Sequence, residues 1–381
     1  MITISLKMLM GEKTKYYGMI SAISFSAFLI LQQLGIFAGI TQITSGFLND
    51  ITEPEIWVMH SKVKYIEDIK QLEENILYKV KGIQGISDAV PIYKGMLRIK
   101  LSDGEYLNST IIGIDENSLI GAPKRITYGK LENILRANSI FIDSVSAKTK
   151  LYNQAEKRPL GVGDEILLND KRAIVAGICD VNQSFQSFPT IYTSYRKAIE
   201  FSGASIKSVS FILVKLKSKK YLNDVKERIN SINGIKALST DEFQEINKGF
   251  FLKESGMVFT IGISVFIAFI IGLGIVAQFF FNFIQDNLKY FGVMKAMGAD
   301  STLLKKMILS QVCLTGFVGF GIGACCTTIF GLLTKGTMMS FNLTFPYFFL
   351  GLSAIGCISI ISGLFGIRKV VKLDSAIIFR G

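Results

Sequence analysis

Residues 255–285 read SGMVFTIGISVFIAFIIGLGIVAQFFFNFIQ, a run of 31 residues without one charged side chain. A helix rises about 1.5 Å per residue, so about 20 apolar residues already cross a hydrocarbon core of about 30 Å. Three further charge-free windows lie at residues 16–49, 307–334 and 336–367. Together the four windows hold 125 of 381 residues, and this segregation of charge excludes an ordinary soluble globular protein.

Lysine and arginine gather on three short flanks of these windows, at residues 1–15, 286–306 and 368–381. The three flanks carry eleven positive and four negative side chains, whereas the hairpin between the last two windows offers only Lys335. Because positively charged flanks of membrane helices stay in the cytoplasm, we expect both termini and the loop 286–306 to be cytoplasmic. Residues 50–254 are then expected to lie outside.

The sequence thus predicts an α-helical membrane protein with four transmembrane helices and a mixed α+β extracytoplasmic domain inserted between helices 1 and 2. The first window is longer than a bilayer requires, which leaves room for helix 1 to extend outside the bilayer. The predicted segments are, in chain order, a cytoplasmic N-terminal segment (1–15), transmembrane helix 1 (16–49), the extracytoplasmic domain (50–254), transmembrane helix 2 (255–285), a cytoplasmic loop (286–306), transmembrane helix 3 (307–334), a short outer hairpin (335–345), transmembrane helix 4 (346–367) and a cytoplasmic tail (368–381).

Composition argues against an enzyme and against a nucleic-acid-binding protein. The outer segment keeps only +4 of the net charge of +12, so most of the basic character reports orientation in the membrane. Cys179 is the one cysteine outside the membrane windows, which excludes a disulfide within that domain. His60 is the only histidine, and neither a phosphate loop nor a hydrolase motif is present. We therefore expect no catalytic residue, no metal site and no cofactor bound by this chain.

Two hairpins are predicted in the outer domain from turn pairs flanked by apolar runs. One joins residues 98–101 to the strand 109–114 through Asp103-Gly104, and the other joins 166–168 to 172–178 through Asn169-Asp170. Residues 209–216 form a further predicted strand.

Helical periodicity occurs at residues 65–80 and 221–232. Each predicted helix is followed by a Gly-Ile step, at Gly82 and Gly234, where glycine suits a helix end because it enters the left-handed region without strain. These two helix-Gly-strand units suggest a pair of related layers with the hairpin-rich part inserted between them.

The loop between the second and third membrane windows reads as a short amphipathic helix. One apolar stripe recurs every three residues, at Leu288, Phe291, Met294 and Met297. Gly298 is placed to end this helix, and Asp300 or Ser301 to cap the next. Such a helix can lie flat in the lipid headgroups, or it can dock in the groove of a cytoplasmic partner; the pattern leaves both open.

The run FGVMKAMGA at residues 291–299 resembles the signature E-(I/Y)-G-(V/T)-L-(R/K)-A-(L/M)-G-A of FtsX-like and MacB-like ABC transporter permeases, the type VII or mechanotransmission superfamily. Those proteins share the outline of one helix, a large outer domain and three further helices. Four short segments of the outer domain are similar in sequence to the MacB-type periplasmic core domain, at residues 83–91, 138–143, 160–166 and 173–178. The loop sequence and the short overall length of the chain look closest to the DevC branch.

The resemblance implies that the loop helix is a coupling helix resting on a separate cytoplasmic ATPase subunit, which would use the ATP. It also implies a permease homodimer in the inner membrane of a bacterium. The implied coupling residues are Leu288, Phe291, Gly292, Val293, Met294, Lys295, Ala296, Met297 and Gly298. Tyr290 stands where the family often has Glu, so a partner group that pairs with that carboxylate has no counterpart here.

For the DevC branch, the resemblance implies export of a glycolipid or other amphiphile together with a periplasmic adaptor protein and an outer-membrane channel. Lipoprotein release is the alternative within the superfamily. FtsX-type signalling to a cell-wall hydrolase, without transport, is an alternative of another class, and a membrane anchor without any ATPase is a third.

Small and amide residues in the membrane windows are candidates for helix packing. Gly35 with Gly39, and Gly319 with Gly323, have the spacing that lets two helices approach closely, although glycine is common in such helices. The amides of Gln32 and Gln33 need partners in hydrocarbon and are expected to face another helix.

The coupling interpretation can be tested by mutation. We expect Phe291→Asp or Met294→Asp to leave the protein folded in membranes and to abolish its co-purification with the ATPase. Undiminished ATPase binding by both variants contradicts the coupling-helix interpretation.

Overall fold

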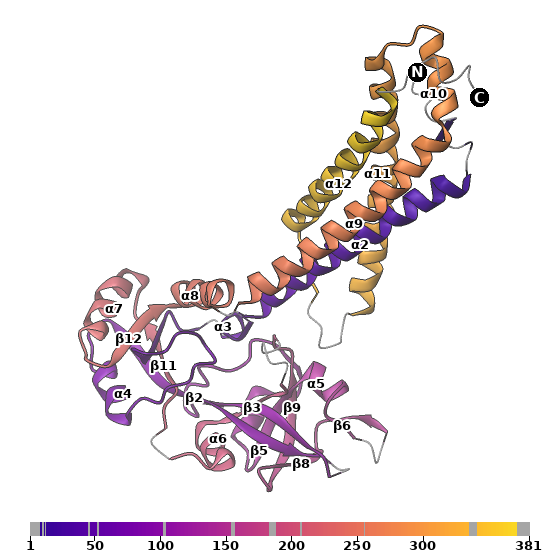
Figure 1. Ribbon diagram of the computed structural model, residues 1–381. Coiled ribbons are helices and arrows are strands. Elements are labelled where there is room, and N and C mark those ends of the chain that lie inside the picture. Colours follow the sequence, from indigo (N-terminus) through magenta and orange to yellow (C-terminus); the bar gives the residue numbers. More distant parts are fainter. Residues whose placement is uncertain are drawn as a thin grey trace. The chain divides into compact units, whose positions relative to one another are not determined.

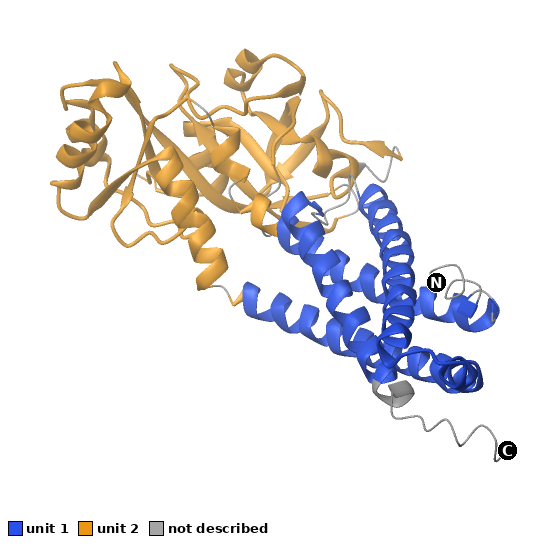
Figure 2. Cartoon of the chain, turned by 90° about the horizontal axis from the view of Figure 1, so that it is seen from above, with its two compact units in different colours: residues 1–39, 257–335, 339–381 blue, residues 40–256, 336–338 orange. Residues whose placement is uncertain are grey.

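The computed structural model describes residues 8–9, 11, 13–44, 46–51, 53–101, 104–153, 157–182, 188–205, 208–254, 256–334 and 341–371. The chain divides into two compact units (Figure 2). We call residues 1–39, 257–335 and 339–381 the helical unit, and residues 40–256 with 336–338 the sheet unit.

In the part of the helical unit that the structure describes there are four long helices and one short one. The long helices are α2 (Lys13–Ile43), α9 (Met257–Asp286), α11 (Ser301–Leu333) and α12 (Phe345–Val371), and the short helix α10 (Leu288–Ala296) lies between α9 and α11. Each long helix is long and apolar enough to cross a membrane. The predicted fold class, four membrane helices with an α+β domain after the first, is confirmed.

Two predicted helix boundaries differ from the structure. Helix α2 ends at Ile43, and Gly46–Asp50 forms a separate short helix, α3, so the window 16–49 is not one helix. Helix α11 begins at Ser301, six residues before its charge-free window, and Asp300 occupies the N-cap position that the loop sequence predicts. The predicted hairpin residue Lys335 lies outside the described residues.

Glycines on α11 lie directly against α2. A Cβ atom built on Gly319 would lie 2.6 Å from Cγ2 of Ile23, and one built on Gly323 would lie 2.7 Å from the carbonyl oxygen of Ser24. A Cβ atom built on Gly35 of α2 would lie 2.2 Å from the ring of Phe341. Gly319 and Gly323 therefore let α11 approach α2 at backbone distance, which is how small residues act in membrane helix packing, whereas Gly35 makes room for an aromatic ring.

This packing predicts a position-specific effect along one helix. Gly323→Leu should destabilise the helical unit by about 1–3 kcal/mol, because the added atoms meet backbone that cannot yield. Gly321→Leu is the matched control, since a Cβ at Gly321 has no neighbour within 4 Å. Thermal unfolding of the full chain in detergent measures the difference, and equal melting temperatures for the two variants contradict the packing.

Two strands near the start of the sheet unit and two near its end pair to form one four-stranded antiparallel sheet. Its strands are β1 (Ile56–His60), β2 (Ile86–Lys100), β11 (Phe211–Leu216) and β12 (Ile235–Ser239), in the spatial order β12-β1-β11-β2 (Figure 1). Helix α4 (Glu74–Lys81) connects β1 to β2, and α7 (Leu222–Asn230), after the short 3₁₀ helix η2 (Lys219–Tyr221), connects β11 to β12. The two β-α-β units thus share one sheet, a split βαββαβ arrangement.

The chain between β2 and β11 adds strands that, together with β2, form a closed ring. Strand β2 pairs with β3 and β8, β8 pairs with β9, β9 with β5, β5 with β10, and β10 returns to β3. The added elements are β3 (Tyr106–Ile114), β4 (Ile126–Tyr128), η1 (Leu131–Leu135), β5 (Ser139–Asp143), α5 (Ser144–Lys148), β6 (Tyr152–Asn153), β7 (Arg158–Pro159), β8 (Glu165–Leu168), β9 (Lys171–Cys179), β10 (Thr190–Ser194) and α6 (Tyr195–Ser202). The insertion between two β-α-β units is confirmed, but those units form a single sheet and not two layers.

Both predicted hairpins are present. In the first, Lys100 of β2 pairs with Tyr106 of β3. In the second, Leu168 pairs with Lys171, and Asn169 and Asp170 take φ angles of 44° and 63°. Two successive residues with positive φ match the turn that the right-handed strand twist favours, and Asn and Asp tolerate it. The strand predicted at 209–216 is β11.

The helix predicted at residues 65–80 is shorter in the structure. Only Glu74–Lys81 is helical, because the preceding residues make long-range contacts instead: Leu72 bridges to Val209, and the ring of Tyr65 stacks on Phe250. Gly82 has φ −77° and does not enter the left-handed region, whereas Gly234 does, with φ +86°.

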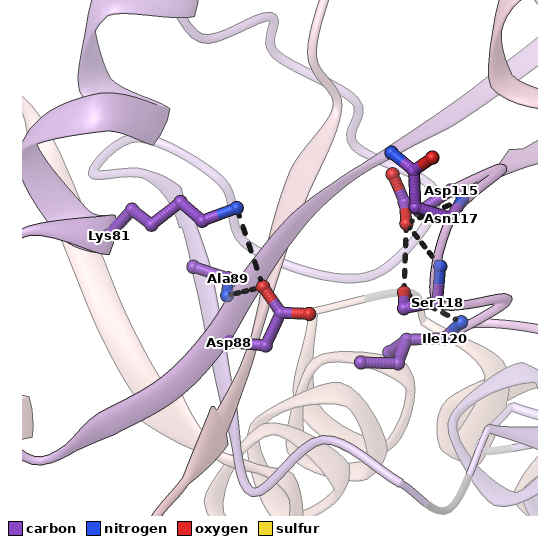
Figure 3. A network of polar contacts seen from close by, with 7 residues as sticks. All are labelled: Lys81, Asp88, Ala89, Asp115, Asn117, Ser118 and Ile120. Atoms are coloured by element: carbon purple, nitrogen blue, oxygen red, sulfur yellow. Dashed lines mark hydrogen bonds and ion pairs between the residues drawn. The ribbon is translucent and has the colours of Figure 1, made fainter.

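Carboxylates fix the turns at two strand ends (Figure 3). Asp88 on β2 accepts from the backbone N–H of Ala89 and lies 3.5 Å from Lys81 at the end of α4. After β3, Asp115 accepts from the backbone N–H and the hydroxyl of Ser118. These contacts fix the backbone at the start of β2 and in the turn after β3.

The four-stranded sheet is buried on both faces, with successive residues facing opposite cores. Ile56 and Val58 of β1 join the core beneath α4 and α7, whereas Trp57 and Met59 join a second core with Leu48 of α3 and Phe243 of α8 (Thr240–Lys253). This double burial explains the continuous apolar run of β11. It also places α3 and α8 together on one face of the sheet.

Candidate functional site

Helix α10 forms where the loop sequence predicts it. Asn287, at its N-cap, is buried and donates through Nδ2 to the carbonyl of Phe283, which keeps the start of α10 close to the end of α9. Gly298 adopts φ +95° and ends the helix, as expected for a glycine with left-handed backbone. Asp300 then stands at the N-cap of α11.

Phe291 and Met294 of the predicted apolar stripe pack in the core of the helical unit or against it. Phe291 is 1% exposed and belongs to the buried core of that unit, and Gly292 beside it is also buried. Leu288 and Met294 are half-buried, and Met294 packs against the same core. The stripe therefore anchors α10 to its own helices.

A second apolar face of α10 is exposed. Tyr290, Val293 and Met297 are 64%, 46% and 74% exposed, and their spacing of three and four residues puts them on one side of the helix. Lys289, Ala296 and Gly298 are exposed as well. This face was identifiable from the same periodicity, since the loop contains two apolar stripes and not one.

Polar contacts lie next to α10, both before its first residue and after its last. Lys15 of α2 forms an ion pair with Asp286 at the end of α9, immediately before α10. On the other side, the hydroxyl of Thr302 donates to the Asp300 carboxylate and lowers its pKa. Lys295 is half-buried and has a contact partner.

The structure distributes the other predicted residues along α2 and α11. Gly35 and Gly39 are buried, and Gln32 and Gln33 are half-buried. Gly319 and Gly323 are buried against α2, as described above. His60 lies at the end of β1, where its Nδ1 accepts from the backbone N–H of Lys62. Among the described residues, no group of three or more His, Cys, Asp or Glu could hold a metal ion.

Sequence reasoning missed a buried aromatic cluster beneath α3 and α8. The rings of Phe47 and Phe243 lie 6.0 and 5.9 Å from that of Trp57, and Phe211 of β11 lies 5.8 Å from it. Helices α3 and α8 thus pack against the same aromatic residue of the sheet, Trp57. We call the chain stretch 40–51 and α8 the connectors, because they are the parts of the sheet unit that continue into α2 and α9.

Asp50 of α3 is the most perturbed carboxyl of the connectors. It is 7% exposed, and its two oxygens accept from the backbone N–H and the side-chain amide of Asn182, at 2.9 and 2.7 Å. Burial raises the pKa of Asp50 to about 7, which outweighs the two hydrogen bonds to Asn182 that lower it.

The raised pKa predicts a stability profile. Because ionising Asp50 is harder in the folded than in the unfolded chain, its contribution is fully present below about pH 4 and is lost as pH rises through about 7. Relative to wild type, Asp50→Asn should therefore gain stability over this window, by on the order of 4 kcal/mol at most. Melting temperature of the full chain against pH measures it. Asp170→Asn, which removes an exposed carboxylate, is the control, and parallel profiles for wild type and Asp50→Asn contradict the prediction.

The arrangement defines a membrane protein whose sheet domain is inserted after its first membrane helix. Two family models match this layout: a MacB-like periplasmic core domain over residues 19–232 and an FtsX-like permease C-terminal domain over residues 261–374. The chain belongs to the family of permeases that combine these two domains. Such permeases are components of ABC transporters whose ATPase is a separate subunit, and the sheet domain of this membrane protein is extracytoplasmic.

Three solved structures similar to about half of this chain are domains of transporter or permease proteins. The extracellular domain of the ABC-type transporter YknZ from Gram-positive bacteria is 13% identical, with TM-score 0.36, over 49% of this chain and 100% of that one. The periplasmic region of MacB from Actinobacillus actinomycetemcomitans is 14% identical, with TM-score 0.38, over 52% and 94%. A domain of a permease protein from Porphyromonas gingivalis is 11% identical, with TM-score 0.30, over 50% and 90%. A comparison with curated protein sequences gave no match.

Proposed function

We propose that this chain is the permease subunit that transmits ATP-driven motion of a separate ATPase subunit to its own extracytoplasmic domain. The observation that carries the proposal is the exposed apolar face of α10, formed by Tyr290, Val293 and Met297. A short helix anchored by one apolar face and presenting another is suited to dock in a groove of a cytoplasmic partner. ATP is then bound and used by that partner, and by no site on this chain.

We propose that the residues of α10 are divided between two tasks. Phe291 and Gly292 are buried in the helical unit, so they act by fixing the helix and not by touching the ATPase. Burial also changes both expectations from the sequence: Phe291→Asp would place a carboxylate in a core, and Met294→Asp would place one against that core. Both would destabilise the protein, so neither reports on docking alone.

Tyr290 gives the docking face an aromatic centre. At 64% exposed, it presents a phenol where the family often presents a carboxylate. We propose that the groove of this ATPase receives the ring by apolar contact and hydrogen bonding, because aromatic residues with a polar tip are favoured at interfaces.

The positively charged flanks support placing α10 and both termini in the cytoplasm of a bacterium, with the permease in the inner membrane. Two permeases and two ATPases make up the proposed assembly. We propose export of a glycolipid or other amphiphile, with a periplasmic adaptor protein and an outer-membrane channel as further partners. The support is the resemblance of the loop sequence to the DevC branch.

Docking through the exposed face predicts a loss of association without a loss of fold. Val293→Asp and Met297→Asp should each weaken ATPase binding at least tenfold, about 1.4 kcal/mol, because each places a charge in an apolar contact. Co-purification of the ATPase with the tagged permease from membranes measures binding. Tyr128→Asp, on a similarly exposed residue of the sheet unit, is the matched control. ATPase recovery equal to wild type for both α10 variants contradicts the docking face.

A further inference from the structure

A chain of buried polar contacts links both connectors to β2. Asn247 of α8 is 0% exposed, and its Nδ2 donates to the carbonyl of Thr44, just after α2. Its Oδ1 accepts from the backbone N–H of Ile66 at 3.0 Å. One side-chain amide therefore holds the exit of α2, the approach to α9 and the loop 61–73 together.

The same loop is held to β2 by a buried lysine. Lys94 is 2% exposed, and its Nζ lies 2.6 Å from a carboxylate oxygen of Glu67 and 3.4 Å from the carbonyl of Ile66. The ammonium also lies 5.0 Å from the ring centroid of Phe47 on α3. A buried charge is costly unless it is paired, so this lysine is fixed in place by its partners.

The position of Lys94 along β2 is informative. Ile92 is the last residue of β2 that pairs with β11, and Tyr93 is the first that pairs with β3. Lys94 thus lies where β2 passes from the four-stranded sheet into the strand ring. Its backbone N–H and carbonyl are both bonded to the hydroxyl of Ser210, at 2.9 and 3.1 Å, which ties this point to β11 as well.

We propose that Thr44, Asn247, Ile66, Glu67 and Lys94 form a connector joint, through which displacement of the connectors reaches β2 and so both parts of the sheet unit. Lys94 and Asn247 are its positioning residues. The inference rests on the proposed function, because it names the route by which the motion enters the extracytoplasmic domain. Fixed, directional polar contacts suit this role, since apolar packing alone restrains separation but permits sliding.

The alternative is that the same contacts only stabilise the domain. A purely structural role predicts faster local opening in variants of the joint, but no change in how the domain responds to nucleotide. The two roles therefore differ in a measurable response and not merely in stability.

The test uses the full-length permease with its co-purified ATPase in lipid nanodiscs. Hydrogen exchange is compared without nucleotide and after trapping with ATP and vanadate, in peptides covering residues 62–68 and 86–100. The first variant, Lys94→Met/Glu67→Gln, removes both charges so that neither is left alone in the interior. The second, Asn247→Leu, removes the bonds to Ile66 and Thr44 and decides the question if the first does not fold.

Both variants should keep ATPase binding and ATP hydrolysis, because neither touches α10. In Asn247→Leu the amide of Ile66 should exchange about tenfold faster, the effect of losing one buried hydrogen bond. In both variants the nucleotide-dependent change at residues 86–100 should be lost. Lys94→Arg should retain that change, as should Lys100→Met, the matched control farther along β2.

The possible results distinguish a failure of the connector joint from a failure of the proposed function. If the joint variants keep the wild-type nucleotide response at residues 86–100, the joint is overturned and the proposed function stands. If the wild-type protein binds no ATPase, or shows no nucleotide response in the sheet unit, the proposed function fails and the joint fails with it.

Discussion

The cost of placing charge in hydrocarbon is the constraint on which the rest of this structure depends. Seventy-two charged side chains are kept out of four windows, and those windows become the long helices α2, α9, α11 and α12. Within the charge-free windows the helices cannot recognise one another through charge, and there they use size: Gly319 and Gly323 let α11 approach the backbone of α2. The sheet unit and α10 follow in the chain from the ends of these helices.

Patterns that depend on neighbouring residues were predictable from the sequence. The hairpin around Asn169 and Asp170 was found because its turn needs two residues that tolerate positive φ. The four membrane helices were found because absence of charge is a local property. The helix expected at residues 65–80 failed because Leu72 and Tyr65 are held by Val209 and Phe250, distant residues that no local pattern reveals.

The orientation of α10 is a second feature that local sequence patterns do not determine. Periodicity identified α10 and an apolar stripe containing Phe291, but it could not say which of two apolar faces turns toward the protein. That choice is made by the core of the helical unit, which receives Phe291 and leaves Tyr290 and Val293 outside. Ring closure between β2 and β8 likewise depends on a pairing, Ile99 with Leu168, that is 69 residues apart in sequence.

Strand β2 explains why one buried lysine can matter to the whole sheet unit. Even-numbered residues such as Val90 and Ile92 face the connectors, and Lys94 continues that row. Odd-numbered residues such as Leu97 and Ile99 face the core of the strand ring. Because a strand is rigidly coupled to its hydrogen-bonded neighbours, a force applied near Lys94 acts on β11 and β3 together. A contact elsewhere on the domain would act first on one part alone.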